Sequence, residues 1–318
     1  MSGEILRAEN VDVVFRYGIM RDKVHALRDF SVSVAEGDFF ALLGPNGAGK
    51  STAMYSFMGL CKIESGRIEL FGKPPSPGSA MFADVAYLPE EPHYHMYLTV
   101  EEALMFYGRL YGKNGFGRAQ ALETLDRMGL IEFRRLPLAK CSKGMKQKVG
   151  IAQCLVGRPR LLFLDEPTRG LDPVIVKEFR DILRSIHSEG ATVVLNSHIL
   201  SEVETLANRA VVMRKGRALR ADKMDNLLRG EKDEYMAMIG NQPGPEAAGN
   251  GALPDYALVM ESNAQRGVTQ VAIPAERFHE FIEFTRTSGR KVHDISLRKK
   301  TLEESVFSIL SMNEESNA

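Results

Sequence analysis

The chain has 318 residues, and its 41 Lys and Arg balance 41 Asp and Glu, so the formal net charge at pH 7 is zero. Hydrophobic residues make up 44% and charged residues 26%, which is typical of a globular protein, and the missing basic excess disfavours a nucleic-acid-binding protein. No apolar run approaches the ~20 residues of a membrane-spanning helix, and no signal-peptide pattern opens the chain. The three cysteines lack metal or disulfide spacing. We therefore expect a soluble cytoplasmic protein.

The first two thirds of the chain alternate short apolar runs with helical patterns, which predicts an α/β architecture. Buried strands of a partly parallel sheet are expected at 39–43, 85–88, 161–164 and 192–195. Residues 89–160 are expected to be helical. Thr99 followed by Glu102 forms a capping-box pattern, another helix is expected over 119–128, and a third should open at Ser142.

The composition changes near residue 240. Residues 241–254 are rich in Gly, Pro and Ala, which predicts a flexible connection. Beyond it, strands are expected at 257–260, 268–273 and 292–296, and helices at 275–287 and 301–310. The first of these helices offers four side chains for packing: Phe278, Phe281, Ile282 and Phe284. We expect a large domain over 1–221, a connecting segment over 222–254 and a small α+β domain over 255–318.

A glycine-rich motif directly follows the strand expected at 39–43 and precedes a helix expected over 52–60. It fits the pattern G-x-x-x-x-G-K-[ST] and comprises Gly44, Pro45, Asn46, Gly47, Ala48, Gly49, Lys50 and Ser51, with Thr52 next. In such a loop, backbone N–H groups wrap the β-phosphate of a nucleotide, the lysine reaches the β- and γ-phosphates and the serine ligates Mg²⁺. The strand–loop–helix context argues against the alternative of a glycine-rich turn without a ligand.

The strand expected at 161–164 ends in the acidic pair Asp165 and Glu166. An aspartate at the carboxyl end of a buried strand can hold Mg²⁺, directly or through water, beside a phosphate loop. A glutamate directly after it can polarise the water that attacks the γ-phosphate. The alternative is that the pair merely opens a helix, which the neighbouring phosphate loop makes the weaker interpretation.

Together these residues resemble the nucleotide-binding subunit of an ATP-binding cassette (ABC) transporter. Residues 141–148 read Cys-Ser-Lys-Gly-Met-Lys-Gln-Lys and resemble the signature motif of that family, Leu-Ser-Gly-Gly-Gln, with matches at Ser142 and Gly144. The resemblance implies that these two residues bind the γ-phosphate of an ATP held by a second subunit. Residues 170–173 resemble the loop that crosses the dimer interface of the family.

Three further residues take roles from the same resemblance. His198 resembles the switch histidine near the γ-phosphate, and Tyr17 the aromatic residue that stacks on adenine. Glu90 stands where many relatives carry glutamine, where it can approach Mg²⁺ or the attacking water. Glu90, the Lys-Gly-Met sequence after Ser142 and the ending over 297–307 resemble a branch of drug- and sodium-extrusion exporters. An amphipathic terminal helix explains that ending nearly as well.

The resemblance implies a P-loop NTPase fold of the ABC type over 1–221, with a helical subdomain at about 89–160 and a small α+β accessory domain at the C-terminus. It also implies an ATP hydrolase that uses ATP and Mg²⁺, works as a homodimer or with a paralogous ATPase, and powers separate membrane-spanning permease subunits from the cytoplasmic face. The helical stretch 89–140 is the expected permease contact. An importer subunit, a soluble ABC ATPase of translation or DNA maintenance, and a small-molecule kinase are the alternatives. The sequence leaves open the transported substrate, the composition of the dimer and the role of the C-terminal domain.

Overall fold

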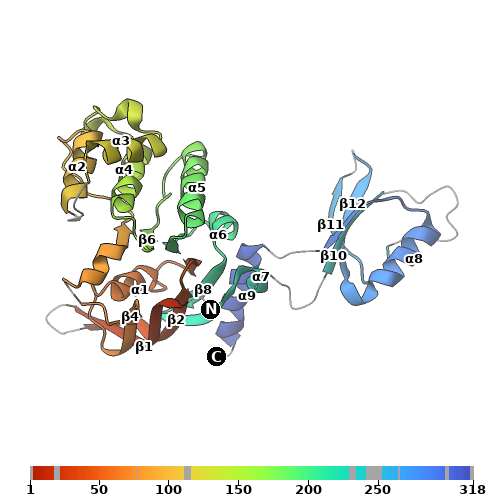
Figure 1. Ribbon diagram of the computed structural model, residues 1–318. Helices are drawn as coiled ribbons and strands as arrows, with labels where there is room; N and C mark the ends of the chain where they lie inside the picture. Colours follow the sequence, from red (N-terminus) through yellow and green to blue (C-terminus); the bar gives the residue numbers. More distant parts are fainter. Residues whose placement is uncertain are drawn as a thin grey trace. The chain divides into compact units, whose positions relative to one another are not determined.

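The computed structural model describes residues 3–17, 22–76, 78–110, 116–228, 234–240, 253–263, 266–297 and 301–315. They divide into two compact units (Figure 1). The first unit comprises the described residues of Met1–Met224 and Val306–Ala318, and the second those of Asp225–Ser305. No helix among these residues is both long enough and apolar enough to span a bilayer.

A six-stranded sheet forms the centre of the first unit, in the order β5-β6-β7-β3-β8-β9. Its strands are β3 (Phe39–Leu43), β5 (Val85–Leu88), β6 (Leu161–Asp165), β7 (Thr192–Asn196), β8 (Arg209–Arg214) and β9 (Arg217–Lys223). The first five run parallel, and β9 is antiparallel to β8. Every residue of β3, β6 and β7 is buried, as expected for strands covered on both faces. The predicted α/β fold is confirmed.

A second, antiparallel sheet in this unit was not predicted from the sequence. It contains β1 (Glu4–Tyr17), β2 (Asp22–Ala35) and β4 (Ser65–Leu70), with β1 in the middle. Helix α1 (Lys50–Phe57) packs between the two sheets, because the ring of Phe57 lies 6.2 Å from that of Phe30 in β2 and 6.4 Å from that of Phe163 in β6. One core therefore fixes the helix that follows the phosphate loop.

The stretch expected to be helical contains α2 (Val100–Leu110), α3 (Arg118–Arg127) and α4 (Lys143–Val156), which gather on one side of the unit (Figure 1). Two short 3₁₀ turns, Ile131–Phe133 and Leu138–Lys140, lie between α3 and α4, and a third, Ala80–Asp84, precedes β5. The predicted capping box is present at the start of α2, where the backbone N–H of Thr99 donates to Glu102 and the backbone N–H of Glu102 donates to the Thr99 hydroxyl. Helices α5 (Pro173–Ser188), α6 (Leu200–Leu206) and α7 (Met224–Leu227) follow later in the chain.

The second unit is a four-stranded antiparallel sheet in the order β11-β12-β10-β13, with helix α8 (Phe278–Ser288) following β12 after a 3₁₀ turn at Ala275–Arg277. The strands are β10 (Glu234–Gly240), β11 (Leu258–Asn263), β12 (Val268–Pro274) and β13 (Val292–Leu297). Phe281 of α8 is fully buried with Ala237, Ile239, Val271 and Ile273. Ile282, which we expected to pack, is instead 38% exposed, so that expectation was wrong.

Two domain boundaries in the structure differ from those expected from the sequence. Strand β10 lies within 222–254, where only a connecting segment was expected, and it pairs with both β12 and β13. Residues 241–252 of the expected linker lie outside the described part of the chain. Helix α9 (Leu302–Glu315) ends the described chain, and from Val306 onward it belongs to the first unit. There the Arg214 side chain donates to the carbonyl oxygen of Leu310 over 2.8 Å.

Candidate functional site

The glycine-rich loop lies between β3 and α1, as its motif predicted. Gly44 has a φ of 146°, and a Cβ placed on it would lie 2.2 Å from the carbonyl oxygen of Met213 in β8. Gly49 has a φ of 101°, and its Cβ would lie 2.5 Å from the carbonyl oxygen of Ala26. Only glycine fits at these two positions, because the loop lies directly against neighbouring backbone and takes conformations that L side chains rarely adopt.

Lys50 begins α1 and reaches back across this loop. Its Nζ donates to the carbonyl oxygen of Gly44 over 2.7 Å and to that of Pro45 over 3.3 Å. The residue is buried, and burial lowers the pKa of its ammonium group, while the nearby Glu166 and Asp165 carboxylates oppose that change. The ammonium group stands at the loop, where its two hydrogen bonds to backbone carbonyls can be exchanged for bonds to phosphate oxygens.

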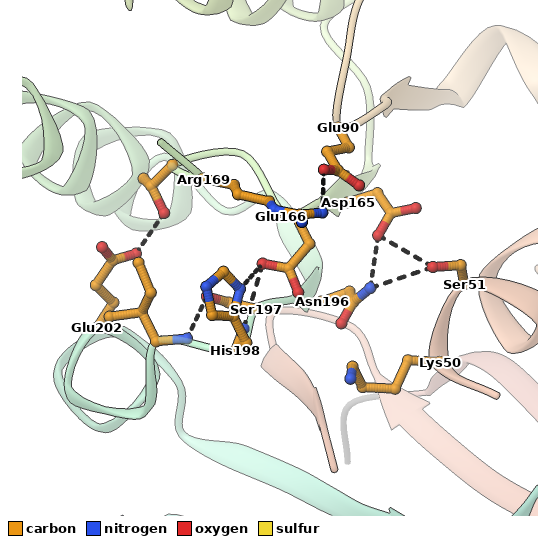
Figure 2. A network of polar contacts seen from close by, with 12 residues as sticks. Lys50, Ser51, Glu90, Asp165, Glu166, Arg169, Asn196, Ser197, His198 and Glu202 are labelled. Carbon is orange, nitrogen blue, oxygen red and sulfur yellow. Dashed lines mark hydrogen bonds and ion pairs between the residues drawn. The ribbon is translucent and has the colours of Figure 1, made fainter. Parts of the chain in front are cut away.

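Ser51, Asp165 and Asn196 form a polar cluster beside the loop (Figure 2). The Asn196 amide donates to Oδ1 of Asp165 over 2.5 Å, and the Ser51 hydroxyl lies 3.4 Å from the same oxygen. Burial raises the pKa of Asp165, and the hydrogen bonds from Asn196 and Ser51 counteract part of that rise. Asn196 was missed as a site residue, although a polar side chain that ends a buried strand is a usable signal.

Glu166 and His198 meet next to this cluster. Oε2 of Glu166 lies 2.5 Å from Nδ1 of His198. The same oxygen accepts a hydrogen bond from the backbone N–H of His198 over 3.3 Å. The backbone N–H of Glu166 donates to the carbonyl oxygen of Asn196 over 2.8 Å. Glu166 has a φ of 47°, a left-handed conformation that costs about 1–3 kcal/mol and persists only where surrounding contacts hold it.

Glu90 lies near the cluster and is joined to Arg169 (Figure 2). Its carboxylate forms an ion pair with Arg169, and its backbone carbonyl accepts a hydrogen bond of 3.0 Å from the side chain of Gln147 in α4. Its charge is also one of the influences that raise the pKa of Asp165. Arg169 and Gln147 were not predicted, since each becomes a neighbour of Glu90 only through the fold.

The remaining predicted residues do not join this cluster. Ser142 caps α4 by accepting a hydrogen bond from the backbone N–H of Met145 over 3.2 Å, as expected, and it is exposed. Gly144 is buried against Ile175 of α5. Within the described ranges, no hydrogen bond links Ser142 to Lys50 or to the acidic pair. Tyr17 ends β1, and its side chain lies outside what the structure describes.

The arrangement combines three chemical elements at the carboxyl edge of a parallel sheet. A glycine loop and Lys50 form an anion site at the start of a helix, Ser51 and Asp165 present adjacent oxygen ligands, and Glu166 carries a carboxylate hydrogen-bonded to His198. These elements suit the binding of a nucleotide triphosphate and attack by water on its terminal phosphate.

Comparison with known proteins gives consistent results. The family model described as "ABC transporter" matches residues 27–169. An ABC transporter ATP-binding protein of Nostoc sp. is 33% identical over 305 residues, which cover 94% of this chain and 88% of the relative. The bacitracin transport ATP-binding protein BcrA of Bacillus licheniformis is 34% identical over 239 residues, which cover 74% of this chain and 75% of BcrA.

Solved structures show the same fold. The ATP-binding subunit of an ABC transporter is 29% identical, with a TM-score of 0.60, and the match covers 70% of this chain and 91% of that one. A bacterial ABC transporter cassette solved as a dimer is 23% identical, with a TM-score of 0.63, covering 71% of this chain and 99% of the cassette. The chain thus belongs to the family of ABC transporter ATP-binding proteins and is an ABC transporter ATPase subunit.

Proposed function

We propose that this ATPase subunit is the motor of an exporter and that it hydrolyses Mg²⁺–ATP in a dimer. The observation that carries the proposed hydrolysis is the convergence of Lys50, Ser51, Asp165, Glu166 and His198 on one edge of the sheet (Figure 2). In this assignment the loop 44–49, Lys50, Ser51 and Thr52 bind the phosphates. The side chain of Tyr17 stacks on adenine.

Ser51 and Asp165 are the residues that would hold Mg²⁺. A hydroxyl and a carboxylate oxygen 3.4 Å apart are hard ligands of the kind this cation takes from proteins, with water and phosphate oxygens completing its shell. When bound, Mg²⁺ neutralises charge on the β- and γ-phosphates. Glu90 lies at the edge of this site. Because its carboxylate is paired with Arg169, it would reach the metal or the attacking water only after a rearrangement on nucleotide binding.

Glu166 acts as the general base in this proposal. Its carboxylate takes a proton from a water molecule whose oxygen attacks the γ-phosphorus, and the bond from that phosphorus to the oxygen of the β-phosphate breaks, which yields ADP and inorganic phosphate. His198 orients the Glu166 carboxylate through the two contacts to Oε2 and stands near the γ-phosphate.

A dimer accounts for the place of the signature residues. Ser142 is exposed at the N-terminus of α4 and, among the described residues, has no hydrogen bond to Lys50 or to the acidic pair, so its helix N-terminus can meet the γ-phosphate bound by a second subunit. ATP binding would close the two subunits, and hydrolysis would release them. Solved cassettes of the same fold include dimeric structures, one of them with bound ADP and Pi.

Two sequence departures favour export over import, and two relatives are named for transport without a stated direction. Relatives named for bacitracin transport and for lantibiotic transport are 34% and 38% identical over their matches. Glu90 and the Lys143-Gly144-Met145 sequence resemble the exporter branch. An importer subunit is the second candidate, because the catalytic cluster itself serves either direction.

The permease would bind the helical stretch 89–140 on the cytoplasmic face of the membrane. This stretch exposes large apolar side chains, among them Tyr97 at 77% and Phe106 at 41%, and the imidazole of His95 contacts both rings. Exposed aromatic residues that cluster on one surface are typical of protein interfaces. Within the same stretch, Glu90 pairs with Arg169, which lies three residues beyond Glu166, and its carbonyl accepts a hydrogen bond from Gln147 of α4.

A pull-down of the tagged chain from detergent-solubilised native membranes tests the partner. We expect near-stoichiometric recovery of a polytopic membrane protein, reduced by Tyr97→Ala and unchanged by Phe307→Ala, which removes an equally exposed ring from α9. Recovery only of ribosomal or DNA-repair proteins would refute the transporter assignment. The architecture of the recovered permease distinguishes export from import.

The Glu166→Gln variant tests the catalytic assignment. Gln retains an oxygen that accepts the hydrogen bond from the backbone N–H of His198 but cannot take a proton, so ATP binding should persist while the turnover number falls by about 10²–10⁴-fold. Near-normal hydrolysis would remove Glu166 from the role of base.

A further inference from the structure

A second pair of side chains joins the two loops that carry Glu166 and His198. Two residues beyond Glu166, the hydroxyl of Thr168 donates to Oε2 of Glu202 over 2.7 Å. Glu202 lies on α6, four residues beyond His198 (Figure 2). Thr168 is 4% exposed and Glu202 6% exposed, so this hydrogen bond is shielded from water. The loops are therefore connected twice, once at the catalytic pair and once behind it.

Short segments of backbone connect Thr168 to Glu166 and Glu202 to His198. Between Glu166 and Thr168 the chain forms a tight turn, in which the N–H of Arg169 donates to the carbonyl of Glu166 over 3.2 Å. Between His198 and Glu202 the chain enters α6, where the N–H of Glu202 donates to the carbonyl of Ile199 over 3.0 Å. Because backbone hydrogen bonds fix both segments, 166–169 and 198–202, the Thr168–Glu202 bond constrains the distance between the Glu166 and His198 side chains.

Glu166 needs such support because its backbone has a φ of 47°. A left-handed conformation at a residue other than glycine relaxes unless its surroundings fix it. The described contacts that hold this residue include the hydrogen bond from its N–H to Asn196, the bond that its carbonyl accepts from the N–H of Arg169, and the contacts of its carboxylate with His198. The hydrogen bond at Thr168 fixes the chain immediately after it.

Burying the Thr168–Glu202 pair is unfavourable for stability. Oε1 of Glu202 has no hydrogen-bond partner among the described residues, and burial raises the pKa of this carboxyl, although Thr168 and the charges of Arg180 and His198 oppose the rise. An apolar pair of similar volume would fill the same space without burying a carboxyl group. The pair is better explained by the geometry that it imposes than by the stability that it adds.

We propose that Thr168 and Glu202 are positioning residues for ATP hydrolysis, which hold the loop of Glu166 against the loop of His198 so that the carboxylate stays aimed at the attacking water. This inference rests on the proposed role of Glu166 as the base. Among the described residues, no hydrogen bond or ion pair joins Thr168 or Glu202 to the phosphate loop, so their loss should affect the chemical step rather than nucleotide binding.

Steady-state ATP hydrolysis by the full chain tests the proposal. Thr168→Val replaces the hydroxyl by a methyl group of similar size, and we expect kcat to fall on the order of 10- to 100-fold, as for a displaced catalytic group, with KM changed less than about threefold. Thr168→Ser restores the donor and should recover most of kcat. Thr205→Val is the matched control, because the Thr205 hydroxyl is exposed and its one hydrogen bond among the described residues stays within α6, to the carbonyl of Ser201.

A second pair of variants keeps the test decisive if Thr168→Val does not fold, as judged by its thermal melting. Glu202→Gln retains an oxygen acceptor for the Thr168 hydroxyl and should keep most of kcat, whereas Glu202→Ala should lose it. Where Thr168→Val does fold, the double variant Thr168→Val/Glu202→Ala should match the single variants within about twofold, because both remove the same bond.

The results also separate this inference from the proposed base. If Glu166→Gln is inactive while folded Thr168→Val keeps the parental kcat, only the positioning role fails. If Glu166→Gln retains hydrolysis, the role of Glu166 fails and the positioning role fails with it. A rise in KM that equals the fall in kcat, or additive losses in the double variant, would show a general structural defect and overturn the proposal.

Discussion

Replacing Gly44 by alanine tests how closely the phosphate loop is held against β8. The new Cβ would lie 2.2 Å from the carbonyl oxygen of Met213, where an ordinary carbon–oxygen contact is about 3.3–3.6 Å, so one of the two must move by about 1 Å. Met213 is fully buried, and β8 pairs with both β3 and β9, so its backbone has little freedom to yield. The loop should therefore move instead.

The expected magnitude follows from two contributions. Strain at a φ of 146° costs about 1–3 kcal/mol, and overpacking costs about a further 1–3 kcal/mol. Gly37→Ala is the matched control, because Gly37 has a φ of 84° and a Cβ added there would meet no atom within 4 Å, so only the strain applies. The difference of about 1–3 kcal/mol should lower the melting temperature of Gly44→Ala by about 2–12 °C relative to Gly37→Ala.

Thermal unfolding and titration with a fluorescent ATP analogue measure the two consequences. The carbonyl of Gly44 accepts the hydrogen bond from Lys50, so a displaced loop also moves the ammonium group, and nucleotide affinity should fall in Gly44→Ala but not in Gly37→Ala. Equal melting temperatures and equal affinities for the two variants would refute the close packing of the loop on β8.

Three further variants test separate features. Lys50→Ala should lose tight ATP binding in the same titration, and unchanged affinity would contradict the phosphate-loop assignment. Asp172→Ala should lower the free energy of unfolding by about 1 kcal/mol, because Asp172 caps α5 by accepting hydrogen bonds from the N–H groups of Val174 and Ile175, while Asp172→Asn should change it little. Burial raises the pKa of Asp165 in the folded chain, so the fold is more stable with this carboxyl protonated than with it ionised. That contribution to the free energy of unfolding is present below the usual pKa of 3.8 and is lost as pH rises through the raised pKa. Nucleotide-free Asp165→Asn should therefore gain stability over the parent as pH rises from 4 to 7 in denaturant titrations, and a constant difference would contradict the burial of a charged Asp165.

The sequence predicted the parts of the fold whose signal is local. The strands at 39–43 and 85–88 have the predicted bounds, because a strand buried on both faces is a continuous apolar run. Strands β1 and β2 were missed, since one face carries charged residues such as Arg7 and Glu9 and register shifts interrupt the alternation. Strand β10 was missed because it directly precedes the Gly- and Pro-rich segment.

The residues of the candidate site also fall into those with a local sequence signal and those without one. The loop with Lys50 and the acidic pair Asp165 and Glu166 belong to contiguous motifs, so their chemistry was predictable without a fold. Asn196, Arg169 and the Thr168–Glu202 pair were not, because each acquires its partner through the order of the strands. The sheet places β7 directly beside β6, although 26 residues separate the end of one from the start of the other, and no local pattern carries that adjacency.

The return of the last helix to the first unit changes how the second unit can be studied. Because the chain leaves the ATPase unit after Met224 and re-enters it at Val306, the four-stranded unit is an insertion rather than a tail. A stop codon before residue 225 would remove α9 along with it, including the partner of Arg214. An informative deletion must splice Met224 to Val306 through a short linker, and a nick within the inserted unit would leave two fragments that each retain part of the ATPase.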